Sequence, residues 1–420
     1  MTALITRPVA SGAASDDTPF TLADIGGMAV IAFYFTLKFG PFEQLYFPHG
    51  FMSTAVLPGL AIAVLAITPG SAIGKAPVSL SLIAVLAWST MSVAWSVNQT
   101  FTLFLIRSEL PALILTMLVV GSMRLELVTK TLVGYVQVIV VWSIFMSVTR
   151  VRGRVSSKGQ GIDDLLVGWR GTFDHKNGLG MFLVFGIATV LAFEHRRVVR
   201  PLTIALCVTG VVGCRSATAA SGMLVLGLTW AWLSALSVSR NKRDQAIFAI
   251  LSVMVGALAV FLTLGLLPSF LDLYGKDLTF SGRTIIWSNT LDVVAQRPLL
   301  GVGFTGNWSN VLAPVVDEVR RSIGFDAAHA HNGAIELLFE VGVVGLVLYL
   351  IFYAGTVRQG MRCLESANPY GRWAVATCAA LAIMSVSEVL FQGAFLGYLA
   401  VVWVVITRAD RVASLAHGRP

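Results

Sequence analysis

Apolar residues occur along this chain in long continuous runs, and about twelve of these runs approach the roughly 20 residues that a helix needs to cross a bilayer. Only helices and closed barrels satisfy their backbone polar groups in lipid, and the runs lack the period-two alternation of barrel strands. We therefore predict helical spans at residues 21–39, 51–69, 77–95, 101–120, 127–149, 178–194, 200–214, 217–237, 246–267, 333–355, 372–388 and 391–408.

Composition agrees with this pattern. Hydrophobic residues make up 56% of the chain and charged residues 12%, and the mean hydropathy of +0.79 excludes a water-soluble globule. The predicted fold class is an all-α polytopic membrane protein. The four cysteines fall within or beside the spans, so no exterior disulfide framework is expected. The first 20 residues lack the apolar core and cleavage site of a removable signal peptide.

Basic residues give the orientation, because cytoplasmic loops are enriched in Lys and Arg. We predict that both termini are cytoplasmic, with tails at 1–20 and 409–420 and a single transmembrane domain at 21–408. This orientation puts the basic clusters of alternate loops inside, and these loops account for much of the net charge of +8 without a nucleic-acid partner. The clusters are Lys75; Arg124 and Lys130; Arg196, Arg197 and Arg200; Arg240, Lys242 and Arg243; Arg358, Arg362 and Arg372; and Arg408, Arg411 and Arg419.

The same alternation places two loops outside, at 150–177 and 268–332, between the fifth and sixth and the ninth and tenth spans. The first loop is rich in Arg and Lys, and the second has the length and Trp, Pro and Gly content of a folded cap. Pro201–Ser239 is long enough to cross and return, with a turn at Gly213–Ser216 that puts Arg215 at the outer face. Cations outside the membrane need a role, and the simplest is to hold an anionic, lipid-linked substrate.

Four motifs lie in or beside these exterior elements. They are Trp169 to Gly180 (WRGTFDHKNGLG); Cys214 to Thr218 (CRSAT); Gly282-Arg283 with Trp287, followed by Arg297 to Phe304 (RPLLGVGF); and His331-Asn332 with Glu340, Gly342 and Gly345. In order and spacing the set resembles the O-antigen ligase and polysaccharide polymerase superfamily (Wzy/WaaL-like), most of all its ExoQ-type exopolysaccharide polymerase branch. The sequence departs from the family pattern at Cys214, where Ser is expected.

The resemblance implies a GT-C-like glycosyltransferase on the outer face of the bacterial inner membrane. It would polymerise oligosaccharide repeat units by taking a glycan from an undecaprenyl-diphosphate carrier and passing it to a sugar hydroxyl, without a nucleotide sugar, a cofactor or a metal. Its partners would be the lipid-linked donor, the glycan acceptor, the bilayer and the machinery for polysaccharide export or chain-length control.

The candidate residues suit that chemistry. A diphosphate leaving group needs fixed positive charge, and arginine offers bidentate donors that stay ionised in a poorly solvated site, so Arg215 and Arg283 are catalytic candidates. Histidine titrates near neutral pH, which makes His331 the candidate general base. Asn332 can cap the following helix, whose amino end favours anions. The predicted substrate-binding residues are Arg170, His175, Lys176, Asn177, Asn332 and Glu340.

Simpler interpretations compete with these roles. An arginine at a membrane surface is often a headgroup contact. Arg283 could have no role beyond starting an amphipathic helix. That helix would end at Arg297-Pro298 and turn Ile286, Thr290 and Val293 toward lipid. Glu340 could orient an arginine or lock helix packing, and His329 is a loop contact rather than the base.

Three other patterns carry less weight. Residues 301 to 306 fit G-x-G-x-x-G, but that pattern binds dinucleotides only between a strand and a helix, so we predict a tight turn. His329 and His331 without a clear carboxylate set make a poor metal site. The pair Arg107 and Glu109 could mark an ion path, although a structural contact is the simpler explanation.

Three functions remain open. The first is the polymerase, and the second is a ligase that delivers glycan to a lipid or protein acceptor through a shared fold and site. The third, of a different class, is a flippase or transporter of lipid-linked sugars. A flippase should line a central cavity with charge from both sides, whereas the unusual cations here gather outside.

The orientation is testable with introduced cysteines. Cysteines at positions 160 and 310 should react with a membrane-impermeant reagent in intact spheroplasts, because both lie in predicted exterior loops. A cysteine at position 242 should react only after lysis. The unmodified protein, with its four native cysteines, is the background control, and labelling at 242 alone would overturn the orientation.

Overall fold

The computed structural model describes residues 19–39, 52–74, 76–149, 168–173, 175–238, 283–304, 311–312, 329–366, 368–390 and 393–416. All regular elements in these ranges are helices, and five of them (α6, α7, α8, α10 and α15) are long and apolar enough to cross a membrane. The helices are α1 (Leu22–Phe39), η1 (Met52–Val56), α3 (Leu57–Ile67), α4 (Gly70–Ile73), α5 (Leu80–Met91), η2 (Ser92–Ala94), α6 (Gln99–Ser122), α7 (Leu125–Val148), α8 (Lys176–Phe193), α9 (Val199–Cys214), α10 (Ala217–Val238), α12 (Arg283–Gln296), α15 (Gly333–Ser366), α16 (Asn368–Met384) and α17 (Gly393–Ala416).

The helices match the predicted pattern closely. A helix occurs at eleven of the twelve predicted span positions, and α9 and α10 are separated by Arg215 and Ser216, within the predicted turn. The all-helical membrane class is therefore confirmed. The predicted span at 246–267 and most of the two exterior loops lie outside the described residues, so the count of twelve spans and the tail boundaries stay predictions.

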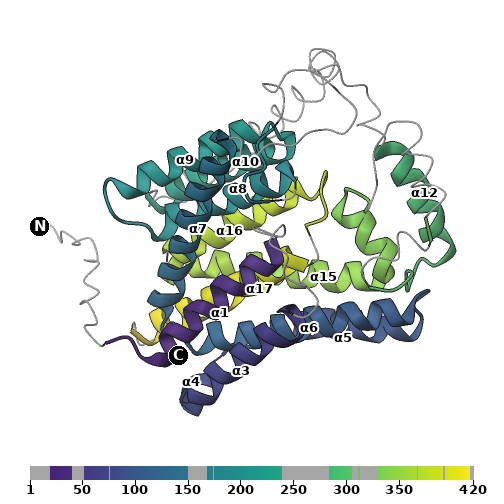
Figure 1. Ribbon diagram of the computed structural model, residues 1–420, viewed down its shortest axis with the longest axis horizontal. Coiled ribbons are helices and arrows are strands. Elements are labelled where there is room, and N and C mark those ends of the chain that lie inside the picture. The colour runs from purple at the N-terminus through teal and green to yellow at the C-terminus, as the bar shows by residue number, and fades with distance from the viewer. Residues whose placement is uncertain are drawn as a thin grey trace, which may run out of the picture.

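The helices form one body around a continuous apolar core. Figure 1 shows α7 to α10 on one side, α3 to α6 along the other, α15 to α17 between them, and α12 at one end. In the middle layer α16 packs against α8, α10 and α15. Each of these contacts buries an apolar face that a single helix would leave exposed.

Polar contacts show that the helices alternate in direction. Arg124, before α7, pairs with Asp24 at the start of α1 at 3.1 Å, and Arg408 near the end of α17 donates to a carbonyl near the end of α6. Arg372, at the start of α16, donates to Ser234 near the end of α10 at 3.3 Å. This arrangement agrees with the predicted alternation. Which end faces the cytoplasm remains a prediction.

α15 is broken at Gly342, whose φ of 67° and ψ of −173° lie outside the helical range. The break frees the carbonyls of Phe339 and Glu340, which accept hydrogen bonds from the N–H groups of Val302 and Gly303 at 2.8 and 2.9 Å. The chain from Pro298 to Gly303 therefore docks into the break. Buried backbone groups need such partners, since each one left unpaired is costly.

The glycine pattern at 301 to 306 serves this docking. Gly301 and Gly303 have φ values of 68° and 110°, and a side chain on Gly301 would overlap the carbonyl of Glu340. The described part of the pattern, Gly301 to Phe304, is thus a turn, as predicted, and it approaches another backbone as closely as only glycine allows.

α12 packs on protein rather than on lipid. Ile286 and Thr290 are fully buried, and Ile286 joins Val302, Ala330 and Phe339 in a second small core. The predicted helix from Arg283 toward Arg297-Pro298 is confirmed. The expectation that Ile286 and Thr290 face lipid is wrong. The first half of α15 and the Pro298–Gly303 segment cover that face instead.

The break in α15 yields a stability prediction. Gly342→Ala should lower the free energy of unfolding by more than about 2 kcal/mol, because the left-handed conformation disfavours a β-carbon and that carbon would overlap the carbonyl of Leu299. Thermal unfolding of the purified protein measures the loss. Gly355→Ala is the matched control, since it lies in the same helix with open space around its β-carbon. Equal melting temperatures for the two variants would contradict this account of the break.

Candidate functional site

The loop that carries His331 is held from both sides. The N–H of Ala330 donates to the Glu336 carboxylate at 2.6 Å, and its carbonyl accepts from the Trp287 indole at 2.8 Å. Asn332 accepts hydrogen bonds from two N–H groups of the first turn of α15, which confirms the predicted cap. His331 itself is buried and adopts a left-handed φ of 48°. The fold therefore fixes where its imidazole lies.

Three helices, α8, α10 and α15, begin around the turn that follows α16, and the described part of α12 lies beside them. Glu388 in this turn contacts Asn177 at the start of α8 and Arg283 at the start of α12. Ser387 bonds Thr218 at the start of α10 at 2.7 Å. The amino end of α15 is joined to the turn by two hydrogen bonds. The Asn332 side chain and the Gly333 N–H donate to carbonyls of the turn at 3.1 and 2.8 Å, respectively. The amino ends of α8, α10 and α15, each with partial positive charge, thus gather at one place.

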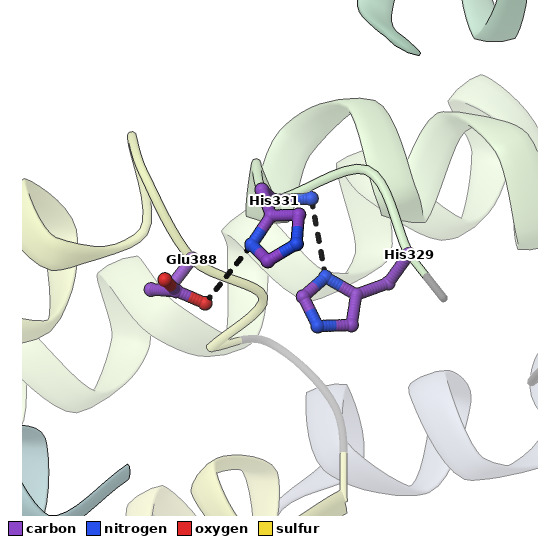
Figure 2. Close-up of side chains that lie close together, drawn as sticks. All are labelled: His329, His331 and Glu388. Atoms are coloured by element: carbon purple, nitrogen blue, oxygen red, sulfur yellow. Dashed lines mark hydrogen bonds and ion pairs between the residues drawn. The ribbon is translucent and has the colours of Figure 1, made fainter. Parts of the chain in front are cut away.

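Glu388 lies at the centre of this arrangement and is 6% exposed. Its Oε1 accepts from the Asn177 amide at 2.5 Å and lies 3.4 Å from Arg283, while its Oε2 lies 3.4 Å from Nδ1 of His331. Figure 2 shows the carboxylate and the imidazole pointing toward each other. Burial alone would raise the pKa of Glu388, but His331, whose Nδ1 lies 3.4 Å from the carboxylate, and the charges of His329 and Arg283 hold that pKa below its usual value. The carboxylate is therefore ionised at neutral pH.

His329 and His175 are held in the neutral form. Burial, followed by the charge of His331, lowers the pKa of His329 to about 4, and its Nδ1 accepts from the His331 N–H at 3.2 Å. Desolvation by neighbouring groups lowers the pKa of His175, even though its side chain is exposed, and the charge of Glu388 opposes this shift; its Nδ1 accepts from the Asn177 N–H as the cap of α8. His329 is the loop contact predicted from the sequence.

The first two motifs, Trp169 to Gly180 and Cys214 to Thr218, pack together beside the residues that surround Glu388. The Trp169 N–H bonds the Gly213 carbonyl at 2.9 Å, and the Lys176 side chain passes close to Gly168 and Cys214. Arg215 ends α9 in a left-handed conformation with φ of 50° and is exposed. The structure thus brings Lys176 to the turn that carries Arg215.

The predicted site residues fall into two groups. Asn177, Arg283 and His331 meet directly on Glu388, and Asn332 joins them through the backbone of the same turn. The contacts of Glu388 do not include Arg170, Arg215 or Glu340. Glu340 is buried beside the break in α15, where its backbone carbonyl holds Gly303.

Left-handed backbone is concentrated in the motifs. Among the described residues only Arg215 and His331 combine a side chain with positive φ, and the glycines with positive φ are Gly171, Gly301, Gly303 and Gly342. All six belong to the four motifs noted in the sequence. Strained backbone persists where the surrounding structure enforces it, and such strain clusters at functional sites. The motifs therefore specify chain geometry as well as chemical groups.

His329, His331 and Glu388 have the composition of a metal site, with ligand atoms within 4.8 Å of one another. Their hydrogen bonding does not suit one. A neutral imidazole has a single acceptor nitrogen, and that of His329 already accepts the His331 N–H. Arg283 and the amino ends of α8, α10 and α15 add positive charge that opposes a cation.

Sequence reasoning missed Glu388 and Glu336. Glu388 ends the predicted span at 372–388, and a carboxylate in an apolar run is expensive unless it is paired. This cost is a sequence signal that would have marked Glu388 as a functional candidate. Glu336 lies in the first turn of α15, where an acidic residue is ordinary, so its bond to Ala330 carries no sequence signal.

The family comparison covers three of the four motifs and leaves out Trp169–Gly180. A family model for O-antigen ligase matches residues 202–350. The chain is also 28% identical over 269 residues to the exopolysaccharide production protein ExoQ of Rhizobium meliloti (strain 1021), a match that covers 58% of this chain and 60% of the relative. The predicted resemblance to the O-antigen ligase and polysaccharide polymerase superfamily, and to its ExoQ-type branch, is confirmed. The chain matches less than two thirds of the length of this relative.

The burial of His329 predicts a dependence of stability on pH. His329 is neutral in the folded protein down to about pH 4 but protonates when unfolded near its usual pKa of 6.5, so its contribution to stability is present above pH 6.5 and is lost as pH falls toward 4. His329→Gln should therefore lose less thermal stability than the unmodified protein between pH 7 and pH 4.5. His195→Gln, at an exposed position, controls for the loss of a histidine. A steeper decline in His329→Gln would contradict the prediction.

Proposed function

We propose that this protein is a metal-independent glycosyltransferase of the exterior face of the bacterial inner membrane, which polymerises undecaprenyl-diphosphate-linked repeat units into an exopolysaccharide or O-antigen-like chain. One observation carries the proposal. Residues of three motifs that are far apart in sequence, Asn177, Arg283 and His331, meet on one buried carboxylate. The match to an exopolysaccharide production protein supports the class of product.

The electrostatics of the site favour an anionic donor. Arg283 and Lys176 lie where α8, α10 and α15 present their amino ends, and Arg215 is exposed beside Lys176. Helix amino ends bind phosphate oxygens through free N–H groups. Only one terminal nitrogen of Arg283 donates to Glu388, so the other N–H donors of this side chain can reach a diphosphate. Arg215, with no contact to Glu388, is the cation best able to move onto the donor.

His331 is the proposed base. In the transfer step the acceptor hydroxyl gives its proton to His331 as its oxygen bonds the anomeric carbon. The bond between that carbon and the diphosphate oxygen breaks, and its electron pair leaves with the diphosphate, whose charge the arginines stabilise. The groups on this chain supply a base, positive charge and orientation.

A ligase is the second candidate, because the family model that matches residues 202–350 is that of O-antigen ligase. A ligase would use the same donor chemistry and deliver the glycan to a lipid or protein acceptor. Only the acceptor separates the two functions, so a single experiment with both acceptors distinguishes them.

The decisive experiment supplies purified protein with a defined polyprenyl-diphosphate oligosaccharide. Chain growth supports the polymerase, and transfer to an added foreign acceptor supports the ligase. His331→Gln should lower turnover by about 10² to 10⁴, the usual worth of a positioned base, while donor binding survives. Arg215→Ala should abolish turnover, and Arg215→Lys should restore it poorly because lysine lacks the bidentate fork.

His329→Gln is the matched control for the base. It removes a neighbouring histidine whose ring centroid lies 4.0 Å from that of His331, and it should have a much milder effect. Normal turnover in His331→Gln would remove His331 from the mechanism and make His175 the next candidate. Product from neither acceptor would leave transport of a lipid-linked sugar as the function to test.

A further inference from the structure

The two oxygens of Glu388 have separate environments. Oε1 is held by the Asn177 amide and faces Arg283, whereas Oε2 is directed at Nδ1 of His331 at 3.4 Å. Figure 2 shows that the carboxylate reaches the imidazole from the turn after α16, opposite the side where His329 lies. Because Asn177 and Arg283 fix one oxygen, the orientation of the other is set by the fold and not by His331 alone.

We propose that Glu388 is a positioning residue for His331: its Oε2 keeps a proton on Nδ1 of the imidazole and so leaves Nε2 as the atom that accepts the proton of the acceptor hydroxyl. A neutral imidazole carries one proton, and the hydrogen bond made by one nitrogen decides which nitrogen is free. The proposal rests on the proposed function, in which His331 is the base.

The chemistry requires Glu388 to stay ionised throughout. When Nε2 takes the acceptor proton, His331 becomes an imidazolium with protons on both nitrogens, and the carboxylate facing Nδ1 stabilises that positive charge. The proton leaves Nε2 after the transfer, and Glu388 gains none. Nδ1 and Oε2 lie 3.4 Å apart without the alignment of a hydrogen bond, as is common for catalytic pairs that align only when substrate is bound.

This role separates Asn177 and Arg283 from ordinary substrate binders. Both hold Oε1, so each affects His331 through Glu388 in addition to any contact with the donor. Strain supports the same conclusion. His331 adopts its left-handed φ in a loop held by Trp287 and Glu336, an arrangement that keeps its ring toward the carboxylate.

The first measurement is turnover in Glu388→Gln, which keeps the size of the side chain but removes its charge. Turnover with the polyprenyl-diphosphate oligosaccharide should fall at least tenfold while the apparent KM for donor changes little. Glu388→Asp keeps the charge and should recover part of the rate. The double variant Glu388→Gln/His331→Gln should be no slower than His331→Gln alone, because the two residues act as one unit.

A purely structural role for Glu388 would give multiplied losses in the double variant, and that result would overturn the proposal. Glu194→Gln is the matched control. Glu194 is a carboxylate of similar burial, 5% exposed, paired with Arg196 at the other end of α8, and its loss should leave turnover near normal. Thermal unfolding of each variant separates failure to fold from failure to react.

The second measurement needs no turnover. Exchange of the imidazole Cε1 hydrogen, followed by mass spectrometry as a function of pH, reports the titration of His331 directly. Loss of the facing negative charge should move that titration to lower pH in Glu388→Gln but not in Glu194→Gln. The charged and titratable groups around His331 are Glu388 after α16, Arg283 on α12, His175 and Lys176 on α8, Glu336 on α15 and His329 on its own loop.

The two measurements distinguish failure of the proposed function from failure of the Glu388–His331 pairing. Unmodified protein that makes no product, but shows the expected shift in Glu388→Gln, would refute the proposed function and keep the pairing of Glu388 with His331. Product formation without the shift, and with multiplied losses, would refute the pairing and keep the function. Turnover that a chelator abolishes and a divalent cation restores would put a metal between these residues and overturn the proposal.

Discussion

A buried carboxylate at the junction of several helices is the constraint on which this structure depends. Moving an isolated ionised carboxylate out of water costs several kcal/mol, so Glu388 is tolerated only if donors and positive charge surround it. These groups are Asn177 in the first turn of α8, Arg283 on α12 and His331 just before α15, so three elements widely separated in sequence must meet at the same place. The pairing that neutralises one side chain thus also aligns the helices that build the site.

Much of the architecture could be predicted because lipid imposes a simple rule on the chain. Continuous apolar runs gave the helix positions, and the two basic clusters flanking Pro201–Ser239 correctly required a turn near Arg215. It was harder to predict what covers each buried side chain, as Ile286 shows. An apolar face looks the same in sequence whether lipid or another helix covers it, and the Pro298–Gly303 segment that covers this one lies elsewhere in the chain.

The candidate site was predicted in part for a similar reason. His331, Arg283 and Asn177 stand in compact motifs, whereas Glu388 is a lone acidic residue 57 positions beyond His331. Its place in an apolar run is a local signal, but no local pattern identifies the distant residues that it contacts. The glycines were noticed as motif members, but their role in permitting left-handed turns and close backbone approaches required the folded chain.

The break in α15 also has a mechanical side. The nine residues from Gly333 to Val341 form an arm of about 13 Å that carries His331 at its tip and Gly342 at its pivot. Tilting that arm by only about 5° would displace the imidazole by roughly 1 Å, a misplacement that can cost an enzyme a hundredfold in rate. Under the proposed function, such leverage would make the clamp of Pro298–Gly303 at the pivot a determinant of catalytic accuracy, even though none of its atoms need touch a sugar.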